Sequence, residues 1–221
     1  MKELLDYRGV VHYKTYPRFE HIPLDARLPY TKLRHIIRNR RTRRERSKNP
    51  LDISLLHPLL NLAVGRTGEL GTDAEDFRGY PSAGARYPLE LYIVSFDVGG
   101  LKRGVYHFNP RDGSLEVLLM GDFLQFIHEA LNGAISDFNK KARAFLIITS
   151  IWERTTFKYG DEGKIFPYIE AGYMGANIVL LLEETGINSV IVGVQWCKDD
   201  LVDLLDINST KEEVISGIVI L

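Results

Sequence analysis

Hydrophobic residues along the chain group into short runs that predict six β-strands. Two of these runs, 89–96 (LELYIVSF) and 144–151 (AFLIITSI), are rich in β-branched and aromatic residues, as strands are. The second run is apolar throughout, which indicates a strand buried on both faces. The expected strands are residues 89–96, 104–108, 115–119, 144–151, 190–194 and 214–221.

Hydrophobic residues at helical spacing predict four helices between and around these strands. The helix at 54–65 is expected to be capped by Ser54. The helix at 167–185 begins at Pro167 and ends before Gly186, and because it is apolar on every side it is predicted to be buried. The expected helices are residues 54–65, 121–138, 167–185 and 198–206.

The order of these elements indicates an α+β domain rather than a doubly wound sheet, because helices and strands alternate around an antiparallel hairpin. The hairpin turn, residues 109–113, contains Pro110 and the dipeptide Asp112-Gly113, which are typical of turns. Residues 66–88 are glycine-rich and are expected to form a long loop. Three prolines interrupt residues 1–30, so this segment is interpreted as an arm and the domain is expected at residues 31–221.

Composition limits the class of protein. A chain of 221 residues that is 45% hydrophobic and 26% charged is long enough to bury a substantial core. Cys197 is the single cysteine, so no internal disulfide can form and a reducing compartment is favoured. The N-terminal residues are not typical of a secretory signal, and the apolar runs are too short to cross a bilayer. We therefore expect a cytoplasmic protein without a membrane partner.

Seven arginines lie between positions 34 and 46, although the formal net charge of the chain is only -1. The forked donors of guanidinium fit phosphate oxygens, and the hydroxyl of Thr42 adds a neutral donor within the cluster. The ligand could be a small phosphorylated molecule or a nucleic acid, and a solvated basic helix face explains the cluster equally simply. A nucleic acid is disfavoured because aromatic residues do not interleave with the arginines and the rest of the chain is not basic.

Two further segments carry residues that could act on a ligand. The segment 81–88 (PSAGARYP) precedes a strand, and its small side chains would let a flat ligand lie against exposed backbone amides. The second segment contains Lys158-Tyr159, and tyrosine becomes a usable base when a cation lies beside it. Both residues can line one pocket only where the backbone is irregular, which Gly160 and Gly163 make plausible. Taken alone, each segment is also explained as ordinary surface.

Together the segments resemble the nitroreductase superfamily of FMN-dependent oxidoreductases, and within it the SagB-type, thiazole/oxazole-forming dehydrogenases. The resemblance extends from about Arg40 to Leu221, in the order RRTxR, PSAGARYPLELY, GVYHFNP, KYG and EAGYMGANIVLLLEETGI. It implies an α+β fold with a central, mostly antiparallel sheet flanked by helices. It also implies an intertwined homodimer with one FMN at each of two subunit interfaces.

The resemblance assigns roles to particular residues. The phosphate and ribityl chain of FMN would be held by Arg40, Arg41, Thr42 and Arg44, leaving Arg34, Arg38, Arg43 and Arg46 mainly solvated. The flavin ring would be covered from the partner subunit by Pro81, Ser82, Ala83 and Gly84, and Val192 and Gly193 would pass near its other side. The pair Lys158 and Tyr159 matches the pair that azoline oxidases of this family need. Two positions depart from the family pattern, with Thr42 where serine is usual and Ile191 where proline is common.

The implied function is oxidation of a small heterocycle or a peptide-borne azoline, by proton abstraction and hydride transfer to flavin N5. A reductase of nitro compounds or quinones that uses NAD(P)H is the alternative on the same fold. A protein that binds FMN without catalysis, or one that binds nucleic acid, remains the alternative from another class. A metal enzyme is not expected, since the six histidines are dispersed without ligand-pair spacing.

Overall fold

The computed structural model describes residues 14, 16–23, 29–69, 76–131 and 141–221 of the chain. The chain divides into two units, Met1–Thr31 and Lys32–Leu221, and the sequence placed this division after residue 30. In the first unit, the described residues include a turn in which the rings of Tyr16 and Phe19 meet edge to face.

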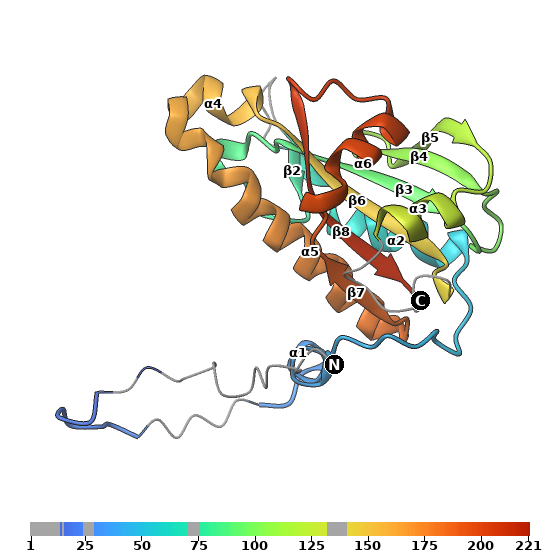
Figure 1. The fold of residues 1–221 in the computed structure, drawn as a ribbon. Helices are drawn as coiled ribbons and strands as arrows, with labels where there is room; N and C mark the ends of the chain where they lie inside the picture. Colours follow the sequence, from blue (N-terminus) through green and yellow to red (C-terminus); the bar gives the residue numbers. More distant parts are fainter. Residues whose placement is uncertain (1–13, 15, 24–28, 70–75, 132–140) are drawn as a thin grey trace, which may run out of the picture. The chain divides into compact units, whose positions relative to one another are not determined.

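A six-stranded antiparallel sheet forms the centre of the second unit (Figure 1). Its strands lie in the order β5-β4-β3-β6-β8-β7, so the predicted hairpin forms one edge. All six strands predicted from the sequence are present within two residues of their expected bounds. They are β3 (Leu89–Ser95), β4 (Gly104–Asn109), β5 (Ser114–Met120), β6 (Ala144–Ile151), β7 (Ser189–Val192) and β8 (Glu212–Ile220).

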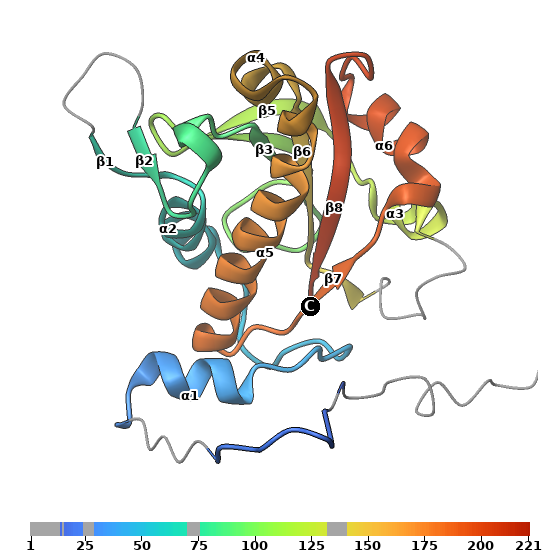
Figure 2. The ribbon, with the colours of Figure 1, turned by 90° about the vertical axis from the view of Figure 1, so that its left-hand side faces the viewer.

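Helices cover both faces of this sheet (Figure 2). On one face α2 (Ile53–Ala63) and α5 (Phe166–Thr185) pack on side chains such as Leu91 and Ile93 of β3. On the other face α3 (Leu124–Ala130) and α6 (Lys198–Leu205) pack on the alternate residues Tyr92 and Val94. Because successive strand residues point to opposite faces, a strand such as β3, in which every residue is buried, is covered from both sides.

The helix α5 is the longest in the described residues, and its ends agree with the sequence prediction. Pro167 occupies its first turn, and Gly186 ends it in a left-handed conformation with a φ of 74°. Within one chain, the prediction that α5 is buried holds for one face only. Met174 and Ile178 are buried against the sheet, whereas Ile169 and Tyr173 are exposed, because only one face of this helix has a neighbour to pack against.

The segment 66–88, predicted to be a loop, contains regular structure. Strands β1 (Arg66–Glu69) and β2 (Asp76–Arg78) form a two-stranded antiparallel sheet, and a short 3-10 helix follows at Ala83–Ala85. Glycine-rich strands carry little hydrophobic pattern, so their pairing is not visible in the sequence. At α2 the cap is Asp52 rather than the predicted Ser54, since the carboxylate of Asp52 accepts a hydrogen bond from the amide of Ser54.

Two further helices differ from the prediction. The helix expected at 121–138 is seen as α3 over residues 124–130, and residues 132–140 lie outside the described residues. The segment around Lys158-Tyr159 was expected to be irregular, but it forms α4 (Glu153–Tyr159). In the described part of the chain no single helix is long and apolar enough to cross a membrane, and only the bent pair 153–164 with 166–185 reaches that length and composition together.

Candidate active site

The loop between β2 and β3 has an unusual backbone. Gly84, Ala85 and Tyr87 all have positive φ values, of 59°, 53° and 44°. Positive φ is uncommon for residues with a side chain and persists only where the surroundings hold it. Here the amide of Tyr87 donates to the hydroxyl oxygen of Ser82 at 2.8 Å, and the amide of Ala85 donates to the Ser82 carbonyl at 3.1 Å.

Two polar side chains of α5 form hydrogen bonds with the backbone of the segment between β2 and β3. The carboxylate of Glu170 accepts a hydrogen bond from the amide of Ala83 at 2.9 Å, and the amide of Asn177 donates to the carbonyl of Gly79 at 2.7 Å. Glu170 is buried, and burial raises its pKa although the bond from Ala83 acts in the opposite direction. The expectation that the loop offers its amides to a ligand is therefore wrong for Ala83, whose amide is already bonded.

Two buried polar atoms lie in this region without a partner among the described residues. They are the second carboxylate oxygen of Glu170 and the hydroxyl of Tyr80. Burial raises the pKa of Tyr80 well above its ordinary value. Unpaired buried polar atoms are rare and costly, so each one calls for a cause such as strain, a bound water or ion, or a catalytic role. Neither residue was identified as a site residue from the sequence, although Glu170 belongs to the EAG motif.

The side chains of Lys158 and Tyr159 converge on Gly84. A Cβ atom placed on Gly84 would lie 2.5 Å from both the Lys158 Nζ and the Tyr159 Oη. The Lys158 Nζ is 5.4 Å from the centre of the Tyr159 ring, and the ring of Phe166 packs against Tyr159 at 5.0 Å. The structure thus brings together Gly84, Lys158 and Tyr159, which are three predicted site residues. Lys158 and Tyr159 reach the loop from the last turn of α4.

The arginine cluster begins on α1 (Lys32–Asn39) and continues along the residues after it. Arg43 pairs with Glu183 near the end of α5, and Arg46 pairs with Asp97, and both arginine side chains stay 42% exposed. Arg41 donates to backbone carbonyls of its own segment. By contrast, no hydrogen bond or ion pair joins the side chains of Arg40, Thr42 or Arg44 to another described residue.

The arginine cluster and the loop lie near opposite ends of α5. Glu170 holds the loop, and Glu183, thirteen residues further on, pairs with Arg43. At 1.5 Å per residue these two glutamates are separated by about 20 Å. Within one chain, therefore, the predicted phosphate site and the predicted ring site do not meet.

The predicted residues Val192 and Gly193 lie at the end of β7, alongside the middle of α5. Val192 is buried, whereas Gly193 is exposed. Ile191 approaches α5 closely, since a Cβ on Gly175 would lie 3.9 Å from its Cδ1. A Cβ on Gly193 would lie 3.0 Å from the Gln195 Oε1 and 3.4 Å from the Trp196 ring, so a side chain there would crowd both residues.

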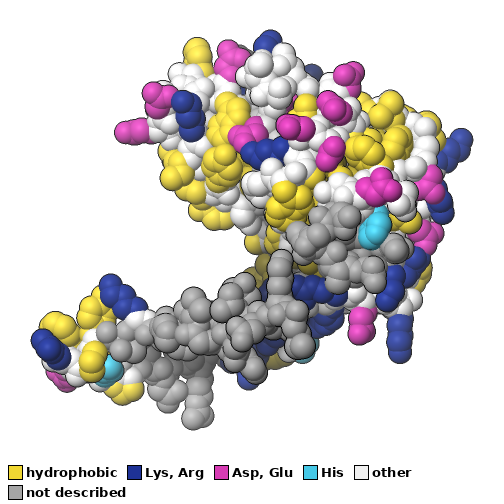
Figure 3. All heavy atoms as spheres, viewed as in Figure 1, with side chains coloured by type: hydrophobic (Ala, Val, Ile, Leu, Met, Phe, Trp, Pro, Cys, Tyr) yellow, Lys and Arg dark blue, Asp and Glu magenta, His cyan; other side chains and the backbone are white. Residues whose placement is uncertain are grey.

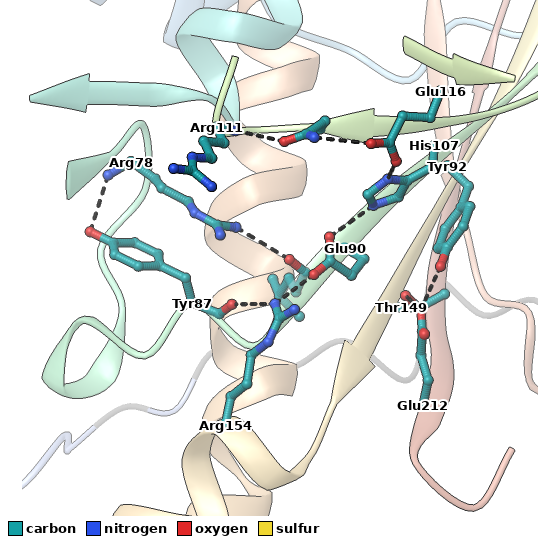
Figure 4. Close-up of polar contacts among 12 residues, drawn as sticks. Arg78, Tyr87, Glu90, Tyr92, His107, Arg111, Glu116, Thr149, Arg154 and Glu212 are labelled. Atoms are coloured by element: carbon teal, nitrogen blue, oxygen red, sulfur yellow. Dashed lines mark hydrogen bonds and ion pairs between the residues drawn. The ribbon is translucent and has the colours of Figure 1, made fainter. Parts of the chain in front are cut away.

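A line of charged groups runs from Arg154 on α4 across β3 to β4 and β5 (Figure 4). The carboxylate of Glu90 contacts Arg154 at 2.5 Å through one oxygen and His107 at 2.9 Å through the other. The other ring nitrogen of His107 lies 2.8 Å from Glu116. Burial opposes charge on Glu90 and His107, but their mutual hydrogen bonds outweigh it, so the pKa of Glu90 is lowered and that of His107 is raised.

A cavity of 470 Å³ opens beside α4. It is lined by Arg86, Ile151, Glu153, Arg154 and Phe157. Phe157 is 85% exposed, as befits the wall of an open pocket, whereas Trp152 packs against Tyr168 instead. Over the described residues, no group of three histidine, cysteine or acidic side chains is placed to hold a metal ion.

Comparison with known proteins agrees with this geometry. The sequence profile described as "Nitroreductase family" matches residues 37–221. The chain belongs to the nitroreductase family. Among its relatives is the nitroreductase-family protein MJ1384 of Methanocaldococcus jannaschii, 36% identical over 163 residues, which are 73% of this chain and 78% of that protein.

Two relatives in this family are named for peptide processing. The trifolitoxin-processing protein TfxB of Rhizobium leguminosarum bv. trifolii is 30% identical over 146 residues, 63% of this chain. The microcin B17-processing protein McbC of Escherichia coli is 31% identical over 116 residues, 51% of this chain. The matched segments are 39% and 42% of those two proteins, so this chain corresponds to under half of each.

Solved structures share the fold. The Escherichia coli microcin synthetase McbBCD complex, with truncated pro-MccB17 bound, contains a chain that matches 98% of this one over 80% of its own length, with a TM-score of 0.71 and 22% identity. A nitroreductase-fold protein from Desulfovibrio desulfuricans, solved in complex with FMN, matches 87% of this chain and 86% of its own, with a TM-score of 0.58 and 13% identity. At these identities the likeness establishes the nitroreductase-like α+β fold. The chain is an oxidoreductase of this family.

Proposed function

We propose that this protein is an FMN-dependent dehydrogenase that oxidises an azoline ring, carried by a peptide or a small molecule, to the aromatic azole. The observation that carries the proposal is the convergence of Lys158 and Tyr159 on Gly84. A reductase that passes hydride from a nicotinamide to an acceptor needs no base, whereas removal of a ring proton does. The peptide-processing relatives McbC and TfxB support a modified peptide as the substrate class.

The residues present fit FMN. Arg40 and Arg44 supply charge for a phosphate and have no partner among the described residues, and Thr42 adds a hydroxyl beside them. At Gly84 the absence of a Cβ lets the Lys158 and Tyr159 side chains approach the backbone of the predicted ring-binding loop. The chemistry that bound FMN supplies is hydride acceptance at N5, with dioxygen or another oxidant as the final electron acceptor.

The side chains of this site have separate tasks in the proposed reaction. Tyr159 Oη takes the proton from the azoline ring carbon that is bonded to the carbonyl group. The Lys158 ammonium stabilises negative charge on the Tyr159 oxygen. Phe166 packs against the Tyr159 ring and limits its rotation. The ring loses one proton and one hydride in total, so a carbon–carbon double bond forms and aromatisation drives the step.

The direct test uses purified protein incubated with FMN and a synthetic peptide that contains one thiazoline. We expect a yellow protein and a product lighter by two hydrogen atoms, detected by mass spectrometry. Steady NAD(P)H oxidation with a nitroaromatic acceptor, without loss of hydrogen from the peptide, would instead establish the reductase. A protein that binds FMN and does neither would be a flavin carrier.

We further propose that the site is completed by a second copy of the chain. The two halves of the predicted site lie about 20 Å apart along α5, and α5 exposes an apolar stripe that includes Ile165, Ile169 and Tyr173. Ile191 of β7 extends this surface and is 52% exposed. Figure 3 shows hydrophobic side chains on the surface where α5 runs in Figure 1. Exposed apolar area of this kind is typical of an interface.

The Ile191→Asp variant is expected to convert a dimer into a monomer that no longer retains FMN, because the new carboxylate would be buried without a partner. Light scattering after size-exclusion chromatography measures the mass, and the absorbance spectrum measures bound FMN. The matched control is Val117→Asp on the edge strand β5, which is 59% exposed and should leave both unchanged. A dimeric, yellow Ile191→Asp protein would contradict the proposal.

A further inference from the structure

Arg154 connects the two parts of the site that carry the predicted catalytic pair and the predicted ring-binding loop. It lies on α4, four residues before Lys158, which is about one turn or 6 Å along the helix. Its Nη1 donates to the carbonyl of Tyr87 at 3.0 Å. Tyr87 closes the loop that contains Gly84 and leads into β3.

The same nitrogen of Arg154 lies 2.5 Å from a carboxylate oxygen of Glu90, the second residue of β3. The Glu90 side chain is only 9% exposed and the Arg154 side chain 35%, so this pair is shielded on the side of the sheet. Losing one partner of a shielded charge pair is costly, because the other partner is left as an uncompensated charge. Glu90 therefore fixes Arg154, and Arg154 fixes the Tyr87 carbonyl.

Glu90 is itself held in place by residues of β4 and β5. His107 contacts its second oxygen at 2.9 Å, Glu116 contacts His107 at 2.8 Å, and Asn109 donates to Glu116 at 3.0 Å. These residues lie on the neighbouring strands β4 and β5 or at the end of β4. Strands paired in one sheet are more rigid than a loop, so the support for Arg154 comes from the sheet rather than from the site.

We propose that Arg154 is a positioning residue, anchored by Glu90, that sets Lys158 and Tyr159 against Gly84. The inference rests on the proposed function for the roles of Lys158 and Tyr159. The backbone of Ile151, just before α4, already donates to the carbonyl of Pro88, just after the loop. Without Arg154 this backbone contact would remain, but the side-chain contact between α4 itself and Tyr87 would be lost. A catalytic group displaced by about 1 Å can lose about a hundredfold in rate. The role assigned to Arg154 is positioning rather than catalysis, because its Nη1 is bonded to Glu90 and to the Tyr87 carbonyl.

The test compares Arg154→Ala, Arg154→Lys and Glu90→Gln in the FMN-loaded protein. We expect Arg154→Ala to lower kcat by about 10- to 100-fold with KM and the flavin spectrum nearly unchanged. Guanidinium chloride at millimolar concentration should restore part of the lost kcat, because the free ion can occupy the space between Glu90 and the Tyr87 carbonyl. Arg154→Lys, which keeps the charge and one donor, should lose less than Arg154→Ala, and Glu90→Gln should fall between wild type and Arg154→Ala.

The matched control is Arg103→Ala, which removes an exposed arginine that pairs with Asp122 on the protein surface. It should leave kcat unchanged, and added guanidinium should have no effect on it. An Arg154→Ala variant with wild-type kcat would overturn the proposal. So would a loss of kcat that guanidinium leaves unchanged while Arg154→Lys behaves like Arg154→Ala, because the loss would then not depend on the guanidinium contacts.

A crystal structure of Arg154→Ala separates this proposal from the proposed function. We expect the Lys158 Nζ and Tyr159 Oη to move away from Gly84 whether or not an azoline is the substrate. If the wild-type protein does not oxidise azolines but the pair moves, the proposed function fails and the positioning role stands. If the pair keeps its place in Arg154→Ala, the positioning role fails whatever the substrate.

Discussion

The Tyr159→Phe variant is expected to lose azoline oxidation by a factor of about 10² to 10⁴ while the purified protein stays yellow. The substitution removes only the hydroxyl that lies beside Gly84 and keeps the ring that packs on Phe166. Loading of FMN should therefore be unchanged. Single-turnover measurement of flavin bleaching under anaerobic conditions, with a thiazoline peptide in excess, gives the rate of the chemical step without the contribution of product release.

The matched control is Tyr106→Phe on β4, whose hydroxyl donates to the carbonyl of Lys102 far along the chain from α4. It should retain full activity. Unchanged bleaching in Tyr159→Phe would remove the base assignment. If Tyr159→Phe loses azoline oxidation but still oxidises NAD(P)H with a nitroaromatic acceptor at the wild-type rate, the flavin is intact. The substitution has then impaired proton abstraction.

The Gly84→Ala variant is expected to lose most of its turnover while remaining folded. The φ of Gly84 is 59°, where a residue with a Cβ costs about 1–2 kcal/mol. The new methyl would also lie 2.5 Å from the Lys158 Nζ and from the Tyr159 Oη. Both atoms are at the ends of side chains, so they would move aside rather than unfold the domain. We expect kcat to fall by at least about tenfold, measured together with the melting temperature.

Gly100→Ala is the matched control for this strain. Gly100 has a φ of 74°, and a Cβ there would meet a methyl group of Ile53 at 2.9 Å. The conformational cost of an alanine is similar at this position, but Gly100 is remote in sequence from the loop and from α4. We expect Gly100→Ala to lower the melting temperature and keep kcat. Equal loss of kcat in both variants would show that Gly84 matters for stability rather than for the arrangement of Lys158 and Tyr159.

Much of the fold could be predicted because its signals are local. The turn at residues 109–113 and the Pro167 and Gly186 ends of α5 are read from neighbouring residues, and the structure confirms them. The run that forms β6 was predicted to be a strand buried on both faces, and its residues are buried in the structure except for the partly exposed Ile151. The family itself was recognisable from the order of short motifs, and the profile match confirms it.

The contacts that build the candidate site could not be predicted because they join residues far apart in sequence. Glu170 and Ala83 are separated by 87 positions, and Arg154 and Tyr87 by 67. No pattern in one sequence records such pairs. The helix α4 was missed for a related reason, since threonines are poor helix formers and tertiary contacts of Arg154 help to hold this helix. The roles of the FMN-binding residues stay predictions.

The distance between Glu170 and Glu183 along α5 has a consequence for how the sequence can vary. A single residue inserted between them would advance one end by 1.5 Å and turn it by about 100°, which would point one of the two carboxylates away from its partner. Surface loops tolerate changes of length, but this stretch of α5 does not. We therefore expect homologues that conserve both glutamate contacts to keep a separation of thirteen positions between the two glutamates.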